Sequence, residues 1–280
     1  MSIKTILAVL NSPEAADSVI ETGVALANKH DAHLIAVYAE APEQVFIYAP
    51  MEIPDPAAIM ALQEAAEQRA TTIQAKFLAI TEREGVSHEW RKFRGAGGYS
   101  SAGVVDSARS TDLVLCAQFD EKTSSAQRAD IEVLIFECGR PVIMVPYIQT
   151  TPKPIERVLI AWNGSREAAR AVFDAMPFLL GAKEVEIFSV DARNDMNQSA
   201  DFAGSELGVT LARHGIKVNA NNVESGGKPV GAVIENRASD FSADLLVMGA
   251  YTHSRIRERI FGGATKTLLG SMTTLTLMSR

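Results

Sequence analysis

The chain has few of the residues on which covalent cross-links, metal sites and hydrolytic centres depend. It contains only two cysteines, Cys116 and Cys138, which provide neither a disulfide framework nor the spacing of a zinc site. Its five histidines are scattered and form no set with metal-ligand spacing. No Gly-x-Ser-x-Gly elbow is present. We therefore expect no metal, no catalytic residues and two small buried thiols, with a redox role for the cysteines as the alternative.

Long apolar runs and an excess of positive charge are also lacking. No stretch approaches the roughly 18 uninterrupted apolar residues of a membrane-spanning helix. The net charge of −7 argues against an extended nucleic-acid surface, because phosphate backbones are bound by clustered lysine and arginine. The first residues include one lysine and no small-residue cleavage site, so we interpret them as mature structure. We expect a cytoplasmic protein that binds neither membranes nor nucleic acids.

What the sequence does contain is an internal repeat. With 280 residues, 47% hydrophobic and 22% charged, the chain has the composition of a folded protein large enough for two cores. The segment Thr5 to Leu10 aligns with Val158 to Asn163, and Asp112 to Ala117 aligns with Asp244 to Gly249. The repeat predicts two similar domains in one chain.

Each copy alternates apolar segments of strand length with segments of helical periodicity. In the second copy, Val158 to Trp162 is a continuous apolar run typical of a strand buried on both faces, and Ser165 occupies the N-cap position of a helix over Arg166 to Leu180. Strands that alternate with helices form βαβ crossovers. We predict an α/β protein of two tandem doubly wound parallel five-stranded sheets, with domains over residues 1–148 and 155–280.

The first copy carries an additional proline-rich segment, Ala41 to Ala57. It includes several large apolar side chains, namely Val45, Phe46, Ile47, Tyr48 and Met51. We expect this segment to fold back onto its own domain, with capping of the other half, or binding of a partner or an apolar ligand, as the alternatives.

A glycine-containing loop follows the apolar run that ends at Gly249. It includes Gly262 and Gly263 and leads into a predicted helix that contains Thr265 to Leu269. Glycines let backbone N–H groups approach an anion, and a helix N-terminus adds N–H donors with roughly half a positive charge. The loop predicts a phosphate-binding site. A second glycine cluster, Gly95 to Ser100, is close to the dinucleotide fingerprint but ends in serine, and we interpret it as a strand-to-helix turn.

Two motifs of the second copy resemble the universal stress protein family: the segment Val158 to Ser165, and the run from Met248 to Thr265. The match covers the whole chain as a tandem pair. The resemblance implies an adenine nucleotide alpha hydrolase-like fold, association through the last strands, and a regulatory role in the stress response.

Nucleotide-binding members of this family carry a glycine, two residues, a second glycine, nine residues, and a third glycine followed by Ser or Thr. Gly249 and Gly262 match the first and third glycines, whereas Thr252 replaces the second and Gly263 replaces the hydroxyl residue. The spacing is intact, but two of the signature residues differ.

The resemblance implies that the second domain binds an adenine nucleotide, ATP or AMP, with or without magnesium. Asn163 stands where the family has an aspartate, and Val190 matches the residue that packs near the adenine. Thr265 matches a position whose hydroxyl contacts phosphate. His253 lies within the glycine loop, either as a ligand contact or as an ordinary loop residue. The expected nucleotide contacts are Asn163, Val190, Gly249, Tyr251, Thr252, His253, Gly262, Gly263, Ala264 and Thr265.

The first copy departs from this pattern. Ala117 stands at the position of Gly249, and our alignment places Leu10 at the position of Asn163, so we expect no nucleotide there. The two copies should form a pseudo-dimer within the chain. The sequence also allows two chains to form a homodimer.

Three functions compete. The leading hypothesis is a nucleotide-binding stress protein that is not an enzyme. The alternative is a ligand-free docking protein of the same fold, because Asn163, Thr252 and Gly263 depart from the family pattern. A nucleotide hydrolase ranks third, because neither a general base nor a set of metal ligands is visible.

Overall fold

The computed structural model describes residues 2–10, 13–40, 56–94, 100–118, 132–192, 204–250 and 271–280, and the structural findings concern these residues. Its strands are β1 (Thr5–Val9), β2 (His33–Glu40), β3 (His88–Arg94), β4 (Leu113–Ala117), β5 (Val142–Val145), β6 (Arg157–Ala161), β7 (Glu184–Val190), β8 (Val218–Val223), β9 (Leu245–Gly249) and β10 (Leu275–Ser279). Its helices are α1 (Pro13–His30), α2 (Pro56–Arg83), α3 (Ser100–Arg109), α5 (Arg166–Asp174), α6 (Met176–Leu179), α7 (Ser205–Arg213) and α8 (Val230–Asp240).

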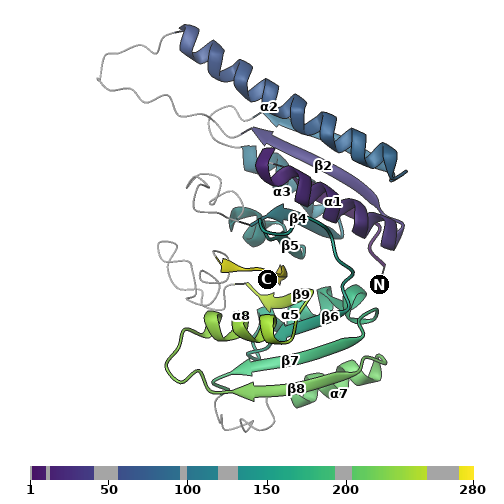
Figure 1. Cartoon of the computed structure of the whole chain (residues 1–280), viewed down its shortest axis with the longest axis vertical. Helices are drawn as coiled ribbons and strands as arrows, with labels where there is room; N and C mark the ends of the chain where they lie inside the picture. Colours follow the sequence, from purple (N-terminus) through teal and green to yellow (C-terminus); the bar gives the residue numbers. More distant parts are fainter. Residues whose placement is uncertain are drawn as a thin grey trace.

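These strands form one ten-stranded sheet in the order β3-β2-β1-β4-β5-β10-β9-β6-β7-β8 (Figure 1). Neighbouring strands are parallel within each half, and the two halves meet at β5 and β10, which pair antiparallel. The predicted α/β class with parallel pairing is therefore confirmed. The two expected five-stranded sheets are joined edge to edge through their last strands.

The junction between the halves has local two-fold symmetry. Val114 of β4 pairs with Val142, and the corresponding Leu246 of β9 pairs with Thr276. At the centre, Ile143 of β5 pairs with Leu277 of β10, which is its own counterpart in the repeat. The repeat seen in the sequence is thus a structural repeat about an axis that passes through this pair.

An aspartate in each half fixes the register of the first strand. Oδ2 of Asp112 accepts hydrogen bonds from the backbone N–H groups of Lys4 (2.8 Å) and Thr5 (3.0 Å). Oδ2 of Asp244 makes the same pair of bonds with Glu156 (2.9 Å) and Arg157 (2.8 Å). Charge-assisted bonds of this kind are among the stronger ones in proteins, so each aspartate fixes where its first strand begins.

This register corrects our sequence alignment of the first strands. Ile6 pairs with Leu113, as Val158 pairs with Leu245, so Ile6 is the counterpart of Val158. The residue equivalent to Trp162 is therefore Leu10, and the residue equivalent to Asn163 is Asn11 rather than Leu10. The alignment was wrong by one residue because a continuous apolar run matches another apolar run almost equally well after a shift of one.

Both faces of the sheet are covered by helices, which explains why inner strands such as β1, β4 and β9 are apolar and buried. The outermost strands, β3 and β8, are polar. One core cluster includes Val19 of α1, Phe77 of α2 and Val172 of α5, all buried against one face. The other includes Val104 of α3 and Ile234 of α8 on the opposite face. No helix among the described residues is long and apolar enough to cross a membrane.

The helix expected over Arg166 to Leu180 is two helices. Its predicted N-cap is confirmed, because Ser165 Oγ accepts a hydrogen bond from the Ala168 N–H at 3.1 Å. The helix is interrupted at Ala175, where α5 ends and α6 begins. Pro177 lacks the N–H that a continuous helix requires, which is the physical reason for the break. Phe173 near the end of α5 is 43% exposed.

Both cysteines are buried and carry no disulfide. Burial raises the pKa of the Cys116 thiol to about 12, and burial also raises the pKa of Cys138. Thiolates are the reactive form of cysteine, so these thiols behave as small apolar side chains at neutral pH.

His30, at the end of α1, joins the two halves away from the sheet. Its ring lies edge to face against Phe178 of α6, with centroids 5.8 Å apart. Its Nε2 is buried and has no hydrogen-bond partner among the described residues. Burial, with smaller contributions from Lys29 and Lys4, lowers the pKa of His30 below its ordinary value. The folded protein therefore favours the neutral imidazole at this contact.

We predict that replacing His30 with Gln flattens the pH dependence of stability. Between the lowered folded pKa and about 6.5, the unfolded chain binds more protons at His30 than the folded chain, so stability falls as the pH falls through this window. Urea unfolding between about pH 7.5 and pH 5.5 measures the slope. His214→Gln is the control, because His214 is exposed at the end of α7. An unchanged slope in His30→Gln would contradict the assignment.

Candidate functional site

The candidate site lies at the carboxyl ends of the strands in the C-terminal half. There β6 is flanked by β7 on one side and by β9 on the other. The chain leaves β6 toward β7 and later returns to β9, so the connections diverge between β6 and β9. In open α/β sheets, ligands bind in the crevice outside the carboxyl ends of the strands at such a switch point.

Three of the residues expected to contact a nucleotide are described, and all three lie at this edge. Gly249 ends β9, Val190 ends β7, and Asn163 follows β6 by two residues. The other seven predicted contacts lie outside the described residues, and these are Tyr251, Thr252, His253, Gly262, Gly263, Ala264 and Thr265. The described part of the candidate site is thus the part formed by the carboxyl ends of β6, β7 and β9.

Asn163 shapes the turn between β6 and α5. The side chain is exposed, and its Oδ1 accepts a hydrogen bond from the Ser165 N–H at 3.1 Å. Gly164, between them, has a φ of +70°, which glycine adopts without strain. The amide therefore lies at the carboxyl end of β6, in a turn that leads into the first residues of α5.

Gly249 is required by packing in this structure. A Cβ at this position would lie 2.4 Å from the Ala168 nitrogen and 2.6 Å from the Glu167 carbonyl carbon. Both atoms belong to the backbone of the first turn of α5, which cannot move aside as a side chain would. The close approach of β9 to α5 thus explains the first glycine of the motif without a ligand.

We predict that Gly249→Ala lowers the free energy of unfolding by about 1–3 kcal/mol, because overpacking against backbone forces the strand and helix apart. Denaturant unfolding of the ligand-free protein measures it. Gly208→Ala in α7 is the matched control, since a Cβ there would meet its nearest atoms at 3.8 Å and 3.9 Å. That change should be neutral or stabilising by up to about 1 kcal/mol. Equal stability of Gly249→Ala and the wild type would contradict the packing role.

Asp191 is a residue of this edge that the sequence analysis missed. It directly follows β7 with a φ of +51°, and its Oδ1 accepts a hydrogen bond from the Ser225 N–H at 2.7 Å. Gly226 and Gly227, with φ of +59° and +82°, complete the turn into α8. An aspartate directly after an apolar strand was the signal available in the sequence. The counterpart of this turn in the first copy, Gly95 to Ser100, lies largely outside the described residues.

Two buried hydroxyls lie at the same edge. Ser189, next to Val190 in β7, and Ser279, paired with Gly249 in β10, are each 2% exposed. Neither Oγ has a hydrogen-bond partner within the part of the chain that the structure describes. Buried polar groups in proteins are nearly always satisfied, so these atoms have hydrogen-bonding capacity left for a ligand or water.

The first turn of α5 carries a negative charge of its own. Glu167 is buried, and its Oε1 lies 3.0 Å from the Arg166 guanidinium, which is itself 83% exposed. A carboxylate at a helix N-terminus interacts favourably with the helix dipole. It also disfavours a phosphate at that position.

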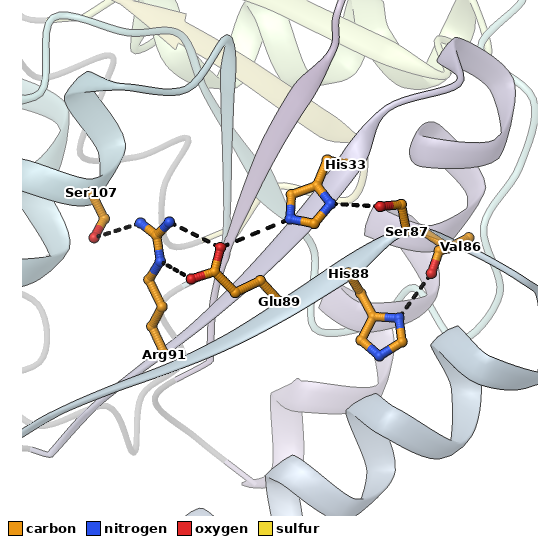
Figure 2. Close-up of polar contacts among 7 residues, drawn as sticks. All are labelled: His33, Val86, Ser87, His88, Glu89, Arg91 and Ser107. Atoms are coloured by element: carbon orange, nitrogen blue, oxygen red, sulfur yellow. Dashed lines mark hydrogen bonds and ion pairs between the residues drawn. The ribbon is translucent and has the colours of Figure 1, made fainter.

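A polar cluster at the start of β2 and β3 offers a second arrangement of reactive groups (Figure 2). His33 Nδ1 lies 2.8 Å from the Ser87 hydroxyl, and its Nε2 lies 3.9 Å from Glu89. Arg91 donates to both oxygens of Glu89, at 2.8 Å and 3.0 Å, and to Ser107 of α3 at 3.3 Å. These hydrogen bonds lower the pKa of Glu89.

This cluster differs from a catalytic triad in its charge arrangement. Both carboxylate oxygens of Glu89 are bound by Arg91, and 3.9 Å is too long for a hydrogen bond to His33. The side chains of His33 and Glu89 are 36% and 46% exposed. We interpret the cluster as a polar network that connects β2 and β3, and through Arg91 also α3.

Comparisons with known proteins bear on both the sequence and the fold. No protein-family model matches the chain. The chain is 28% identical over 162 residues to universal stress protein Slr1230 of Synechocystis sp., a match that covers 56% of this chain and 54% of that protein. The alignment therefore spans about half the length of that relative.

Two solved structures are similar in fold over nearly their whole length. A universal stress protein from Archaeoglobus fulgidus DSM 4304 matches with a TM-score of 0.71 and 15% identity, over 100% of this chain and 97% of that one. A putative universal stress protein from Pseudomonas aeruginosa UCBPP-PA14 matches with a TM-score of 0.59 and 16% identity, over 99% of this chain and 93% of that one. Both likenesses extend across the two halves of the sheet.

Proposed function

We propose that this chain, whose resemblance to the universal stress protein family is confirmed by its sequence likeness to one such protein and by its fold, binds an adenine nucleotide in its C-terminal half. The observation that carries the proposal is the convergence of Asn163, Val190 and Gly249 at the switch point between β6 and β9. Its role would be regulatory in a stress response, as a binding protein and not an enzyme.

The described residues fit the base and ribose of such a ligand. Val190 is half-buried and packs with the core on the α8 side of the sheet, so it offers an apolar surface to a base. The amide of Asn163 and the carboxylate of Asp191 offer acceptors of the kind that ribose hydroxyls pair with. The buried hydroxyl of Ser189 has no hydrogen-bond partner among the described residues and could bond to the ligand. This mixture of apolar surface and a few polar groups is typical of small-molecule sites.

Phosphate binding falls, in this proposal, to the loop residues Gly262, Gly263, Ala264 and Thr265, with Tyr251, Thr252 and His253 before them. The proposed ligand is either ATP or AMP. Magnesium would arrive with the nucleotide, because no group of three or more His, Cys, Asp or Glu residues in the described ranges is placed to hold a metal ion.

The N-terminal half is proposed as a partner domain without a nucleotide. The corrected register gives it Asn11 at the position of Asn163, so the difference between the halves does not rest on Leu10. It rests on Ala117, whose Cβ stands where Gly249 has none. We propose domains over residues 1–148 and 155–280, a cytoplasmic location, and association of the chain as a homodimer.

One observation favours the alternative, a docking protein of the same fold that has lost its nucleotide. Gly249 is explained by its contact with α5, where its neighbours include the backbone and Cβ of the buried Glu167. A glycine kept for packing would persist after loss of a ligand. The two functions therefore differ in one measurable property, which is nucleotide binding by protein free of carried-over ligand.

We predict that calorimetric titration of ATP or AMP, with and without magnesium, gives one site per chain. Asn163→Ala should weaken binding by about tenfold, the loss expected for one hydrogen bond to a ligand. Asn11→Ala, at the equivalent position of the other half, is the matched control and should bind like the wild type. Gly262→Asp should abolish binding, because a carboxylate would repel the phosphates.

The variants should first be shown to melt like the wild type. Absence of heat and of any thermal shift with either nucleotide would reject nucleotide binding and leave the docking function. Equal losses in Asn163→Ala and Asn11→Ala would place the ligand in both halves and contradict the proposed asymmetry.

A further inference from the structure

A surface hollow of about 390 Å³ lies at the opposite edge of the sheet from the candidate nucleotide site. It is formed by the segment between the halves (148–151 and 153), the residues that follow α8 (242–244) and the residues that lead into β10 (273–275). These are the amino-terminal ends of β9 and β10, whereas Gly249 lies at the carboxyl end of β9. The hollow is thus separate from the site at the switch point.

The repeat shows what covers the equivalent place in the N-terminal half. The pairing of Ile143 with Leu277 makes Thr274 the counterpart of Arg140. The guanidinium of Arg140 lies over the end of α3 and donates from Nε (3.2 Å) and Nη2 (3.1 Å) to the carbonyl oxygen of Arg109. In that half an arginine therefore neutralises the end of a helix.

In the C-terminal half the corresponding helix end is covered less well. Phe241, which follows α8, is the counterpart of Arg109, and its carbonyl oxygen has a 3.4 Å contact from Nη1 of Arg157. Thr274, on the wall of the hollow, carries no guanidinium of its own. The hollow lies beside Thr274 and the residues that directly follow α8, whereas the guanidinium of Arg140 covers the corresponding helix end of the N-terminal half.

The hydrogen-bond acceptors around the hollow suit a cation that donates several hydrogen bonds. The carboxyl end of α8 carries the negative pole of the helix dipole, roughly half a charge. Asp244 adds a carboxylate, whose Oδ2 already accepts the N–H groups of Glu156 and Arg157. The hydroxyls of Thr150, Thr151 and Thr273 add acceptors. Lys153, exposed on the wall, and Arg157, which also pairs with Glu184 at 3.4 Å, are the opposing charges. A guanidinium suits this surface better than an ammonium, because its planar fork directs several N–H donors at fixed acceptors, as Arg140 does in the other half.

We propose that this hollow binds a guanidinium group, supplied either by a small guanidino compound or by an arginine side chain of a partner protein. The proposal stands apart from nucleotide binding, since the two places lie at opposite edges of the sheet. In the N-terminal half, the guanidinium of Arg140 binds the equivalent helix end, which is the precedent for the chemistry. In the C-terminal half, the smaller Thr274 takes the place of Arg140 and leaves room for a ligand.

The first test is thermal melting with methylguanidinium chloride at millimolar concentrations, with ionic strength held constant by sodium chloride. The wild type should show a saturable rise in Tm of about 2 °C at ten times the dissociation constant. Methylammonium should give a smaller rise or none. Thr274→Arg should melt higher than the wild type and lose the response, because its own guanidinium covers the hollow.

Two further variants make the test independent of how Thr274→Arg folds. Lys153→Gln should tighten binding by several-fold, because it removes the like charge on the wall. Arg140→Thr is the positive control, since it uncovers the end of α3. This variant should melt lower than the wild type and should also respond to methylguanidinium.

Tripeptide Gly-Arg-Gly and agmatine distinguish the two sources of the guanidinium. Tighter binding of the peptide indicates a partner's arginine, and tighter binding of agmatine indicates a small compound.

Absence of a saturable response in the wild type, while Arg140→Thr responds, would overturn the proposal with the assay shown to work. Weaker binding in Lys153→Gln, together with a response of the wild type to phosphate, would overturn it in favour of an anion site.

Discussion

The antiparallel pairing of β5 with β10 is the contact on which the rest of the structure depends. It turns two parallel five-stranded units into one sheet, and it centres their symmetry on Ile143 and Leu277. Because the two units run in opposite directions, the carboxyl ends of their strands lie at opposite edges. The candidate nucleotide site of the C-terminal half and its degenerate counterpart therefore face away from each other. For the same reason, the hollow beside Thr274 lies at the edge of the sheet that holds the carboxyl ends of the N-terminal strands.

Much of the fold was predictable from the sequence, because strands buried on both faces give apolar runs that stand out from the helices. The strand at Val158 and the cap at Ser165 were found in this way. The register was not, because it depends on two backbone hydrogen bonds to Asp112 and two to Asp244, which no periodicity reveals. The break at Ala175 was also missed, although Pro177 was its visible cause.

The candidate site was predictable in position but less so in its physical meaning. The spacing of the glycine motif led to Gly249, and the topology places it with Asn163 and Val190. A close backbone contact with α5 also requires this glycine. Such a contact depends on how closely β9 and α5 pack, and local sequence does not reveal that. Asp191 was missed because its role in the turn involves Ser225, which is distant in sequence. One glycine thus serves packing and, in the proposed function, leaves room for a ligand.

The most direct test of nucleotide binding at the β6 and β9 ends is hydrogen exchange measured by mass spectrometry, with and without AMP or ATP. The account predicts slower exchange in peptides that contain Asn163 to Ala168 and Ser189 to Asp191. Peptides of the N-terminal half around Ala117, and those around Thr274 at the opposite edge, should be unchanged. Slower exchange confined to the N-terminal half, or none in any peptide at saturating nucleotide, would contradict it.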